Sequence, residues 1–269
     1  MWNNGSMQHA LSLPPVGSPR DLADLAVTAE AGGWDAVFLW DHLHLVRSMR
    51  LPIVDPWVTL GAIAARTERV MLGPLITPLP RRRPWKVAKE LVTLDHLSGG
   101  RAIFGAGLGF PPDDEFGAFG EPTDARARAD LLDEGLVVLD ALLRGLPFDH
   151  DGEHFHVHAE LLPRSRREPR PPIWIAAMQP FRRPLARALR WDGIAPIGND
   201  GGPLTPDALA DYLRGVALPA GFDVVAGRLA GYSVADYEQA GATWLVESRW
   251  PDGDWFDELT LAAREGPRL

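Results

Sequence analysis

The stretch at residues 70–109 reads VMLGPLITPLPRRRPWKVAKELVTLDHLSGGRAIFGAGLG, and it contains one complete strand–helix–strand unit. The apolar residues 70–76 predict a buried strand, and residues 84–97 predict a helix that begins with a proline. The turn Ser98-Gly99-Gly100 ends this helix, and residues 101–105 predict the next strand. A strand, a helix and a second strand in this order predict a parallel pair with a right-handed crossover.

The same unit repeats along the chain on both sides of this stretch. Helices are predicted to begin at Ser18 and Asp55, Thr123 is predicted to cap a long helix, and a last helix covers about 255–264. Further strands are predicted at 8–13, 35–40, 173–177, 193–197, 223–226 and 242–247. Strands that alternate with helices over 269 residues predict an α/β fold, a (β/α)8 TIM barrel that forms one domain over residues 7–269. We leave residues 1–6 outside it, as a tag remnant or a disordered N-terminus.

One segment, residues 145–171, interrupts the alternation between the fourth helix and the fifth strand. Residues 148–156 predict a short hairpin that turns at Asp151-Gly152. Histidines occupy alternate positions there, which a strand places on one face, at His150, His154, His156 and His158. Because no carboxylate or thiolate completes a defined ligand set, we predict no metal site.

Composition excludes several classes of function. The net charge of −9 argues against binding to nucleic acid, and the absence of cysteine excludes disulfides and thiol nucleophiles. The chain has no apolar run long enough to cross a bilayer and no signal peptide is visible, so we expect no membrane association and a cytoplasmic location.

In a barrel of parallel strands, the working residues follow the carboxyl ends of the strands. Trp40, Asp41 and His42 follow the second predicted strand. Histidine suits proton transfer near neutral pH, an adjacent aspartate can fix its tautomer, and the tryptophan ring can stack on a cofactor. The structural alternatives are that Asp41 caps a loop and that His42 is a satisfied structural histidine.

Three glycines, Gly105, Gly107 and Gly109, lie within five residues at the end of the fourth predicted strand. They allow a tight turn where the strand ends, or they let a flat ring approach the backbone closely. We favour the second interpretation, because a turn alone does not require three glycines.

The remaining candidates follow other strands. Thr77 precedes three arginines, residues 81–83, which either face solvent or bind an anion at a helix start; we select Arg83 for that role. Met178 follows the fifth predicted strand and Glu247 the eighth, so both are candidates for contact with a cofactor.

Several of these stretches together resemble the bacterial-luciferase-like flavin oxidoreductases. The resemblance is carried by LVTLDHLSGGR at 91–101 running into GAGLG at 105–109, by Thr77-Pro78 with Arg82-Arg83-Pro84, and by GWDAVFLWDH at 33–42. It implies a (β/α)8 barrel that binds FMN or the deazaflavin coenzyme, which is an 8-hydroxy-5-deazaflavin. It also implies monooxygenase, reductase or dehydrogenase activity and a homodimer.

The resemblance also assigns positions in the site. A histidine after the second strand lies near the ring, which is His42 here, and an Asp-His pair is typical of the deazaflavin-using branch. That branch can place a working glutamate directly after the glycines. Phe110 occupies this position, and the nearby Asp113, Asp114 and Glu115 are not aligned with it.

The sequence therefore predicts a flavin- or deazaflavin-dependent oxidoreductase that acts on a small organic molecule. His42 handles a proton, Asp41 orients it, and the glycines and Arg83 hold the cofactor. Two alternatives stay open. One is a ligand-binding barrel without turnover, and the other is a hydrolase that uses Asp41 with Glu247 as a carboxylate pair.

Overall fold

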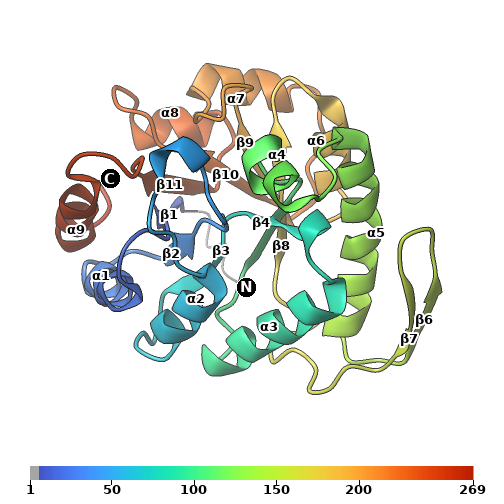
Figure 1. Cartoon of the computed structure of the whole chain (residues 1–269). Helices are drawn as coiled ribbons and strands as arrows, with labels where there is room; N and C mark the ends of the chain where they lie inside the picture. Colours follow the sequence, from blue (N-terminus) through green and yellow to red (C-terminus); the bar gives the residue numbers. More distant parts are fainter. Residues whose placement is uncertain (1–5, 269) are drawn as a thin grey trace.

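The computed structural model describes residues 6–268, and a parallel sheet that curves round on itself forms its centre (Figure 1). The strand order is β3-β2-β1-β11-β10-β9-β8-β5-β4. The strands are β1 (Gln8–Leu13), β2 (Ala36–Leu39), β3 (Met71–Pro74), β4 (Thr77–Pro78), β5 (Phe104–Gly107), β8 (Ile173–Met178), β9 (Gly193–Ile197), β10 (Asp223–Gly227) and β11 (Trp244–Ser248). Of the predicted N-terminal tail, residues 1–5 lie outside the described residues.

Helices surround the sheet, as the alternating sequence predicts (Figure 1). They are α1 (Pro19–Ala31), α2 (Pro56–Ala64), α3 (Pro84–Leu97), α4 (Pro112–Glu115), α5 (Ala125–Leu143), α6 (Arg182–Ala188), α7 (Pro206–Leu213), α8 (Val234–Gln239) and α9 (Trp255–Glu265). None of the helices within residues 6–268 combines the length and the apolar character needed to cross a membrane.

The barrel fold predicted from the sequence is confirmed, with one change in the third strand. This strand is divided into β3 and β4, which are separated by a cis peptide bond between Leu75 and Ile76. β4 pairs with β5. β3 is joined to the chain just before β5 by the backbone of Leu72, whose N–H donates to the carbonyl of Arg101 (3.1 Å) and whose carbonyl accepts from the N–H of Ile103 (2.9 Å). The fourth strand consequently begins later than predicted, at Phe104.

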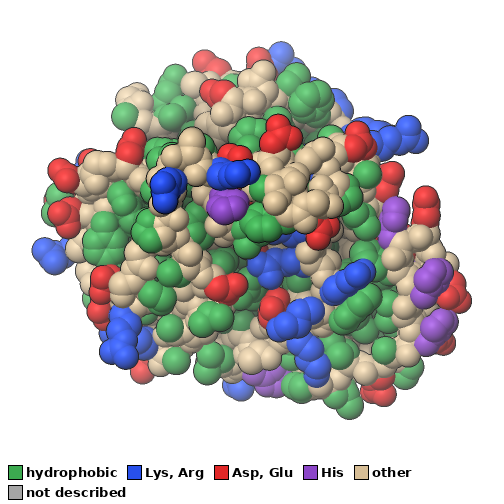
Figure 2. All heavy atoms as spheres, viewed as in Figure 1, with side chains coloured by type: hydrophobic (Ala, Val, Ile, Leu, Met, Phe, Trp, Pro, Cys, Tyr) green, Lys and Arg blue, Asp and Glu red, His purple; other side chains and the backbone are tan. Residues whose placement is uncertain are grey.

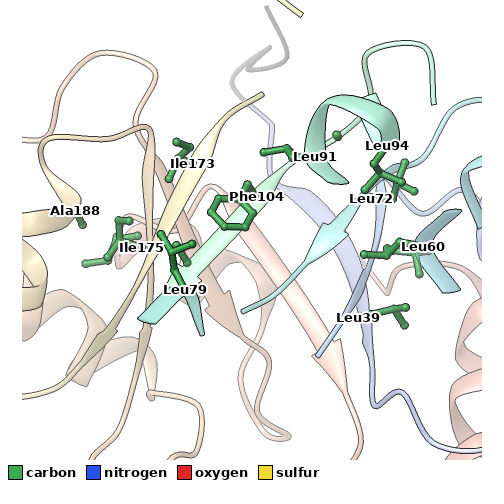
Figure 3. Packing of buried hydrophobic residues seen from close by; sticks show 14 of the residues in the cluster. Leu39, Leu60, Leu72, Leu79, Leu91, Leu94, Phe104, Ile173, Ile175 and Ala188 are labelled. Atoms are coloured by element: carbon green, nitrogen blue, oxygen red, sulfur yellow. The ribbon is translucent and has the colours of Figure 1, made fainter. Parts of the chain in front are cut away.

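Two layers of apolar side chains hold the barrel together. The outer layer lies between strands and helices; Figure 3 shows Ile175 of β8 directed toward Ala188 of α6. The inner layer fills the barrel with the rings of Phe38, Trp174 and Trp244, whose centroids lie 5.2–6.3 Å apart in edge-to-face arrangements. The barrel interior is therefore a packed core that closes the site from below.

Side-chain caps begin the helices where the sequence indicates, with one exception. Ser18 accepts from the backbone N–H of Arg20, and Asp55 accepts from that of Val58. The prediction that Thr123 caps the long helix α5 is wrong by one residue. Asp124 is the cap, and its carboxylate accepts from the N–H of Ala127 at 2.8 Å.

The predicted hairpin is present as β6 (Phe148–Asp151) and β7 (His156–Ala159), which project beside α5 (Figure 1). Asp151 pairs with His156, so the turn covers residues 152–155 rather than Asp151-Gly152. Carboxylates do accompany these histidines: His156 contacts Asp151 (3.2 Å) and His158 contacts Asp149 (3.1 Å). Across residues 6–268, no group of three histidine or carboxylate side chains is arranged to hold a metal ion.

Packing around Gly105 yields the first testable prediction. A Cβ at this position would lie 2.7 Å from the carbonyl oxygen of Pro74 and 2.8 Å from Cδ1 of Ile76. We expect Gly105→Ala to lower the free energy of unfolding in urea by about 1–3 kcal/mol, because backbone and side chain must shift. Gly61→Ala on α2 is the control, because a Cβ there meets nothing within 4 Å. It should raise stability by about 0.5–1 kcal/mol. Equal stability of the two variants would contradict this packing.

Candidate active site

Three loops meet at the carboxyl ends of the strands, and buried charges connect them. The loops follow β2, β4 and β5 and comprise residues 40–45, 79–83 and 108–119. Arg81, from the middle loop, donates to the carboxylates of both Asp41 and Glu115. These two acids and Arg81 are almost completely buried, so the three loops form one unit around a compensated charge cluster.

Asp41, in the loop after β2, is buried, and both oxygens of its carboxylate accept hydrogen bonds. It accepts from the hydroxyl of Thr77 at 2.8 Å and from the indole N–H of Trp57 at 3.2 Å. Arg82 donates to its other oxygen at 2.9 Å, beside the bond from Arg81. Asp41 therefore fixes the loop to the barrel wall, and Thr77 is a buried partner of Asp41.

Glu115 holds the loop that carries the histidine. The carboxylate of this residue, which is 1% exposed, accepts from three consecutive backbone amides, those of Leu43, His44 and Leu45, at 2.7–3.1 Å. Leu45 adopts a left-handed conformation with φ of 60°, which lets the backbone curl around the carboxylate. Sequence reasoning placed no role on Glu115.

The charge state of Glu115 follows from these contacts. Burial alone would raise the pKa of its carboxyl group, because the charged form loses hydration. The neighbouring His42, the amide of Leu43 and the Arg81 guanidinium outweigh that penalty and hold the pKa of Glu115 well below its ordinary value. Glu115 is therefore a permanent anion at neutral pH.

His42 lies beside Glu115 rather than against Asp41. Its Nδ1 atom is 3.6 Å from Oε1 of Glu115, and its side chain is 20% exposed. Because an ionised carboxylate accepts but cannot donate, we assign the ring proton to Nδ1, which leaves the lone pair on Nε2. The predicted orienting role of Asp41 is corrected by this geometry, because the carboxylate of Asp41 bonds to arginines, Thr77 and Trp57. Glu115 is the carboxylate beside the imidazole, at ion-pair distance from an Nδ1 atom that makes no hydrogen bond.

Two tryptophans form a wall next to His42. The ring of Trp40 is 6.2 Å from the His42 ring and 5.9 Å from the ring of Trp250. Ser12 accepts from the indole N–H of Trp40 at 3.0 Å, and Ser248 donates to the backbone oxygen of Ser12 at 2.7 Å. The wall thus includes elements from β1, β2 and the loop after β11.

The barrel is open to solvent at this end. Along β8, Trp174 faces the interior, so Ala176 and Met178 face it too. Both are partly exposed, whereas the outward-facing Ala177 between them is buried. Solvent therefore reaches Ala176 from inside the mouth, and Met178 is the last residue of β8 rather than the first after it. Figure 2, viewed toward this face, shows apolar side chains, basic side chains and a histidine around it.

The glycines of β5 and of the loop directly after it allow close packing of the chain itself. A Cβ on Gly107 would lie 2.9 Å from Cγ2 of Ile76, and one on Gly109 would lie 2.5 Å from the Phe116 ring. With Gly105, they leave room for Ile76 and Phe116. The favoured interpretation, that the missing side chains admit a cofactor ring, is therefore corrected: the space beside each glycine is taken by the protein.

The last two predicted residues lie in different surroundings. Arg83 is exposed at the first position before α3, with its guanidinium 5.8 Å from the Trp85 ring. Glu247 lies on β11 between the interior-facing positions, so it points outward, and it pairs with Arg228 at 3.0 Å. Because side chains alternate along β11, the side chain of Glu247 lies on the outer side of the barrel, away from the mouth. This orientation also separates Glu247 from Asp41, so the proposed carboxylate pair of a hydrolase does not form.

Acid unfolding tests the role of Glu115. Because its pKa is lower in the folded protein than its ordinary value of 4.5, its stabilising effect is complete above that pH and is lost as the pH falls below it. We expect Glu115→Gln to lower the free energy of unfolding at pH 7 by about 3–5 kcal/mol, since Arg81 loses a buried partner. Stability of the variant should also fall less steeply below pH 4.5.

Asp113→Asn is the matched control, because Asp113 lies on the same short helix and is exposed. Urea unfolding at several pH values measures both variants. Parallel pH profiles for the wild type and Glu115→Gln would contradict the assignment of a buried, ionised Glu115.

Comparison with known proteins places this geometry in context. Residues 1–217 match the family described as luciferase-like monooxygenase. An F420-dependent glucose-6-phosphate dehydrogenase from Nakamurella multipartita is 32% identical over 206 residues, which are 76% of this chain and 59% of the relative. A 4-hydroxyprotoasukamycin monooxygenase from Streptomyces nodosus subsp. asukaensis is 35% identical over 197 residues, 72% of this chain and 50% of the relative. The chain spans about half the length of the curated relatives it matches.

Solved structures share the barrel over nearly the whole chain. The F420-dependent tetrahydromethanopterin reductase of Methanopyrus kandleri superimposes with a TM-score of 0.78 at 18% identity, covering 97% of this chain and 98% of the other. An F420-dependent secondary alcohol dehydrogenase gives a TM-score of 0.77 at 18% identity, with 96% and 99% covered. At this identity the likeness establishes the fold.

Proposed function

The chain belongs to the luciferase-like monooxygenase family, as its sequence resemblance predicted, and we propose that it is an oxidoreductase that uses the deazaflavin coenzyme F420 on a small organic substrate. The observation that carries the proposal is His42, held against the ionised Glu115 beside the open barrel mouth. A homodimer in the cytoplasm completes the proposal and rests on the family resemblance alone.

The mouth fits a flat ring system. Three interior-facing positions above the aromatic plug carry small side chains, namely Ser12, Ala176 and Ser248. Below them the rings of Phe38, Trp174 and Trp244 provide a closed apolar floor. Small side chains above large ones leave a shallow recess, and a planar apolar ring is the shape that such a recess accommodates.

The side chains of the site supply proton chemistry. When bound, an oxidised deazaflavin accepts a hydride from a carbon that carries a hydroxyl group. His42, with Nδ1 facing Glu115, presents the lone pair of Nε2 and takes the hydroxyl proton. Glu115 keeps the ring in this tautomer and stabilises the positive charge that the ring gains. The aromatic wall of Trp40 and Trp250 excludes water on one side of His42.

Arg83 supports the assignment of a cofactor with an anionic tail. Arg81 and Arg82 are directed inward, onto Asp41 and Glu115, whereas Arg83 is exposed where α3 begins. The amides of the first turn of this 14-residue helix add partial positive charge at the same place. We therefore propose that Arg83 meets the phosphate or carboxylate groups of the coenzyme tail.

FMN is the rival cofactor, and the 35% identity with a monooxygenase favours it. A second rival is a barrel that binds ligand without turnover, which the residue at Phe110 supports because the working glutamate expected from the resemblance is replaced there. Two measurements separate these rivals from the proposed function. If FMN is the cofactor, the protein binds FMN in preference to F420. If turnover has been lost, the protein binds its cofactor but does not oxidise or reduce a substrate.

Titration of the purified protein with F420 and, separately, with FMN tests the proposal. We expect micromolar binding of F420, followed by its fluorescence, and weaker binding of FMN. His42→Asn should bind F420 with unchanged affinity, since its ring acts on the substrate proton. The variant should also reduce F420 with a secondary alcohol at least about a hundredfold more slowly, the usual contribution of a general base.

His44→Asn is the control, because the ring of this neighbouring histidine stacks on Phe119 at 5.2 Å, and its bond to Glu115 comes from the backbone amide, which the substitution keeps. Preferential binding of FMN would replace the deazaflavin assignment. Equal turnover of the wild type and His42→Asn would remove His42 from the chemistry.

A further inference from the structure

Large apolar side chains surround the mouth and are exposed to solvent. They come from the loops after β2, β5, β8 and β11, so they lie on several sides of the barrel. Each is about half exposed, and the set consists of Leu43, Phe110, Phe119, Phe181 and Trp250. Single exposed apolar residues are ordinary on a protein surface, but a group of them around the carboxyl ends of the barrel strands marks a binding surface.

Trp250 connects this rim to the reacting group. It is 47% exposed, and its ring lies 5.9 Å from that of Trp40, which is in turn 6.2 Å from His42. The apolar surface therefore continues without a gap from the outer loop after β11 to the imidazole. A molecule whose hydroxyl reaches His42 has to pass along this aromatic surface.

Phe110 lies on the other side of the mouth. It follows β5, and β5 is separated from β11 in the sheet by β10, β9 and β8, which places the two strands across the barrel from each other. Phe110 is 52% exposed, and its ring edge lies 4.0 Å from where a Cβ on Gly201 would stand. The loops after β5 and β9 thus approach each other beneath an exposed aromatic ring.

Six arginines at the mouth end of the barrel are bound to the protein itself. Each arginine of this set donates to a carboxylate or to a backbone carbonyl, and the set consists of Arg81, Arg82, Arg128, Arg182, Arg228 and Arg249. An anionic group that reached these six would have to compete with their partners, whereas Arg47, Arg50 and Arg183 are exposed. Arg83 is set apart at the start of α3, where the proposed function assigns it to the cofactor.

We infer that the substrate is a molecule with an apolar body, an aliphatic or aromatic alcohol or ketone, and that Trp250 and Phe110 contact that body. The inference rests on the proposed function for the reaction at His42 and adds the class of substrate. It separates this protein from a sugar phosphate dehydrogenase, whose substrate has little apolar surface. Trp250 and Phe110 are then residues that determine specificity.

Saturation-transfer NMR tests the inference without coenzyme or turnover. The full chain is mixed with equal concentrations of cyclohexanol, a neutral apolar alcohol, and glucose 6-phosphate. We expect transfer to cyclohexanol and none to the sugar phosphate. In Trp250→Ala and Phe110→Ala, the dissociation constant for cyclohexanol should rise at least about tenfold, as for truncation of an aromatic contact residue. Leu146→Ala is the control, because Leu146 is 61% exposed on the connection between α5 and β6.

Each other outcome would overturn the inference. Transfer to glucose 6-phosphate would show an anion-binding mouth, and transfer to neither compound would show that the rim does not hold an apolar ligand. Unchanged cyclohexanol binding in both variants, with a change in their oligomeric state on size-exclusion chromatography, would assign the rim to contact between copies of this chain. Failure of the proposed function is measured separately, by the F420 titration.

Discussion

The bonds from Arg81 to Asp41 and Glu115 are the interaction on which the mouth of the barrel depends. They join three loops that follow different strands, and all three side chains are almost fully buried. Burial of charged groups costs more than a single ion pair returns, so such a cluster is stable only when every partner is present. With Arg82, two cations balance two carboxylates, and the loops have one arrangement that satisfies them all.

The chemistry of the site follows from that balance. Glu115 is kept ionised by its neighbours, and it wraps the backbone of residues 43–45 around itself beside His42. The histidine is thus positioned by a carboxylate that is remote in the sequence, on a loop that cannot move without breaking several buried hydrogen bonds. Such preorganisation is what a general base at a cofactor site requires. The aromatic surface from His42 to Trp250 then determines which molecules reach it.

Most strands and helices of the barrel can be predicted from local sequence. The site depends on which side of a strand each residue faces and on contacts between residues far apart in the sequence. Strands, turns and caps are local signals, and the error at Thr123 was one residue. Asp41 and His42 are adjacent, but their side chains have different neighbours, so the predicted pairing does not form. Alternation along β11 turns Glu247 outward, since Trp244 and Val246 face inward. Glu115 lies about 70 residues from the amides it binds, and its sequence carries no signal of that contact.

The tautomer of His42 tests the central claim most directly. Nitrogen-15 labelling of the histidines and two-bond nitrogen–proton correlation spectra distinguish a proton on Nδ1 from one on Nε2, and His42→Asn identifies the signal among the 8 histidines. We expect neutral His42 to carry its proton on Nδ1, toward Glu115, and Glu115→Gln to remove this preference. A proton on Nε2 in the wild-type protein would exclude this arrangement, because Nε2 would then be unable to accept the substrate proton.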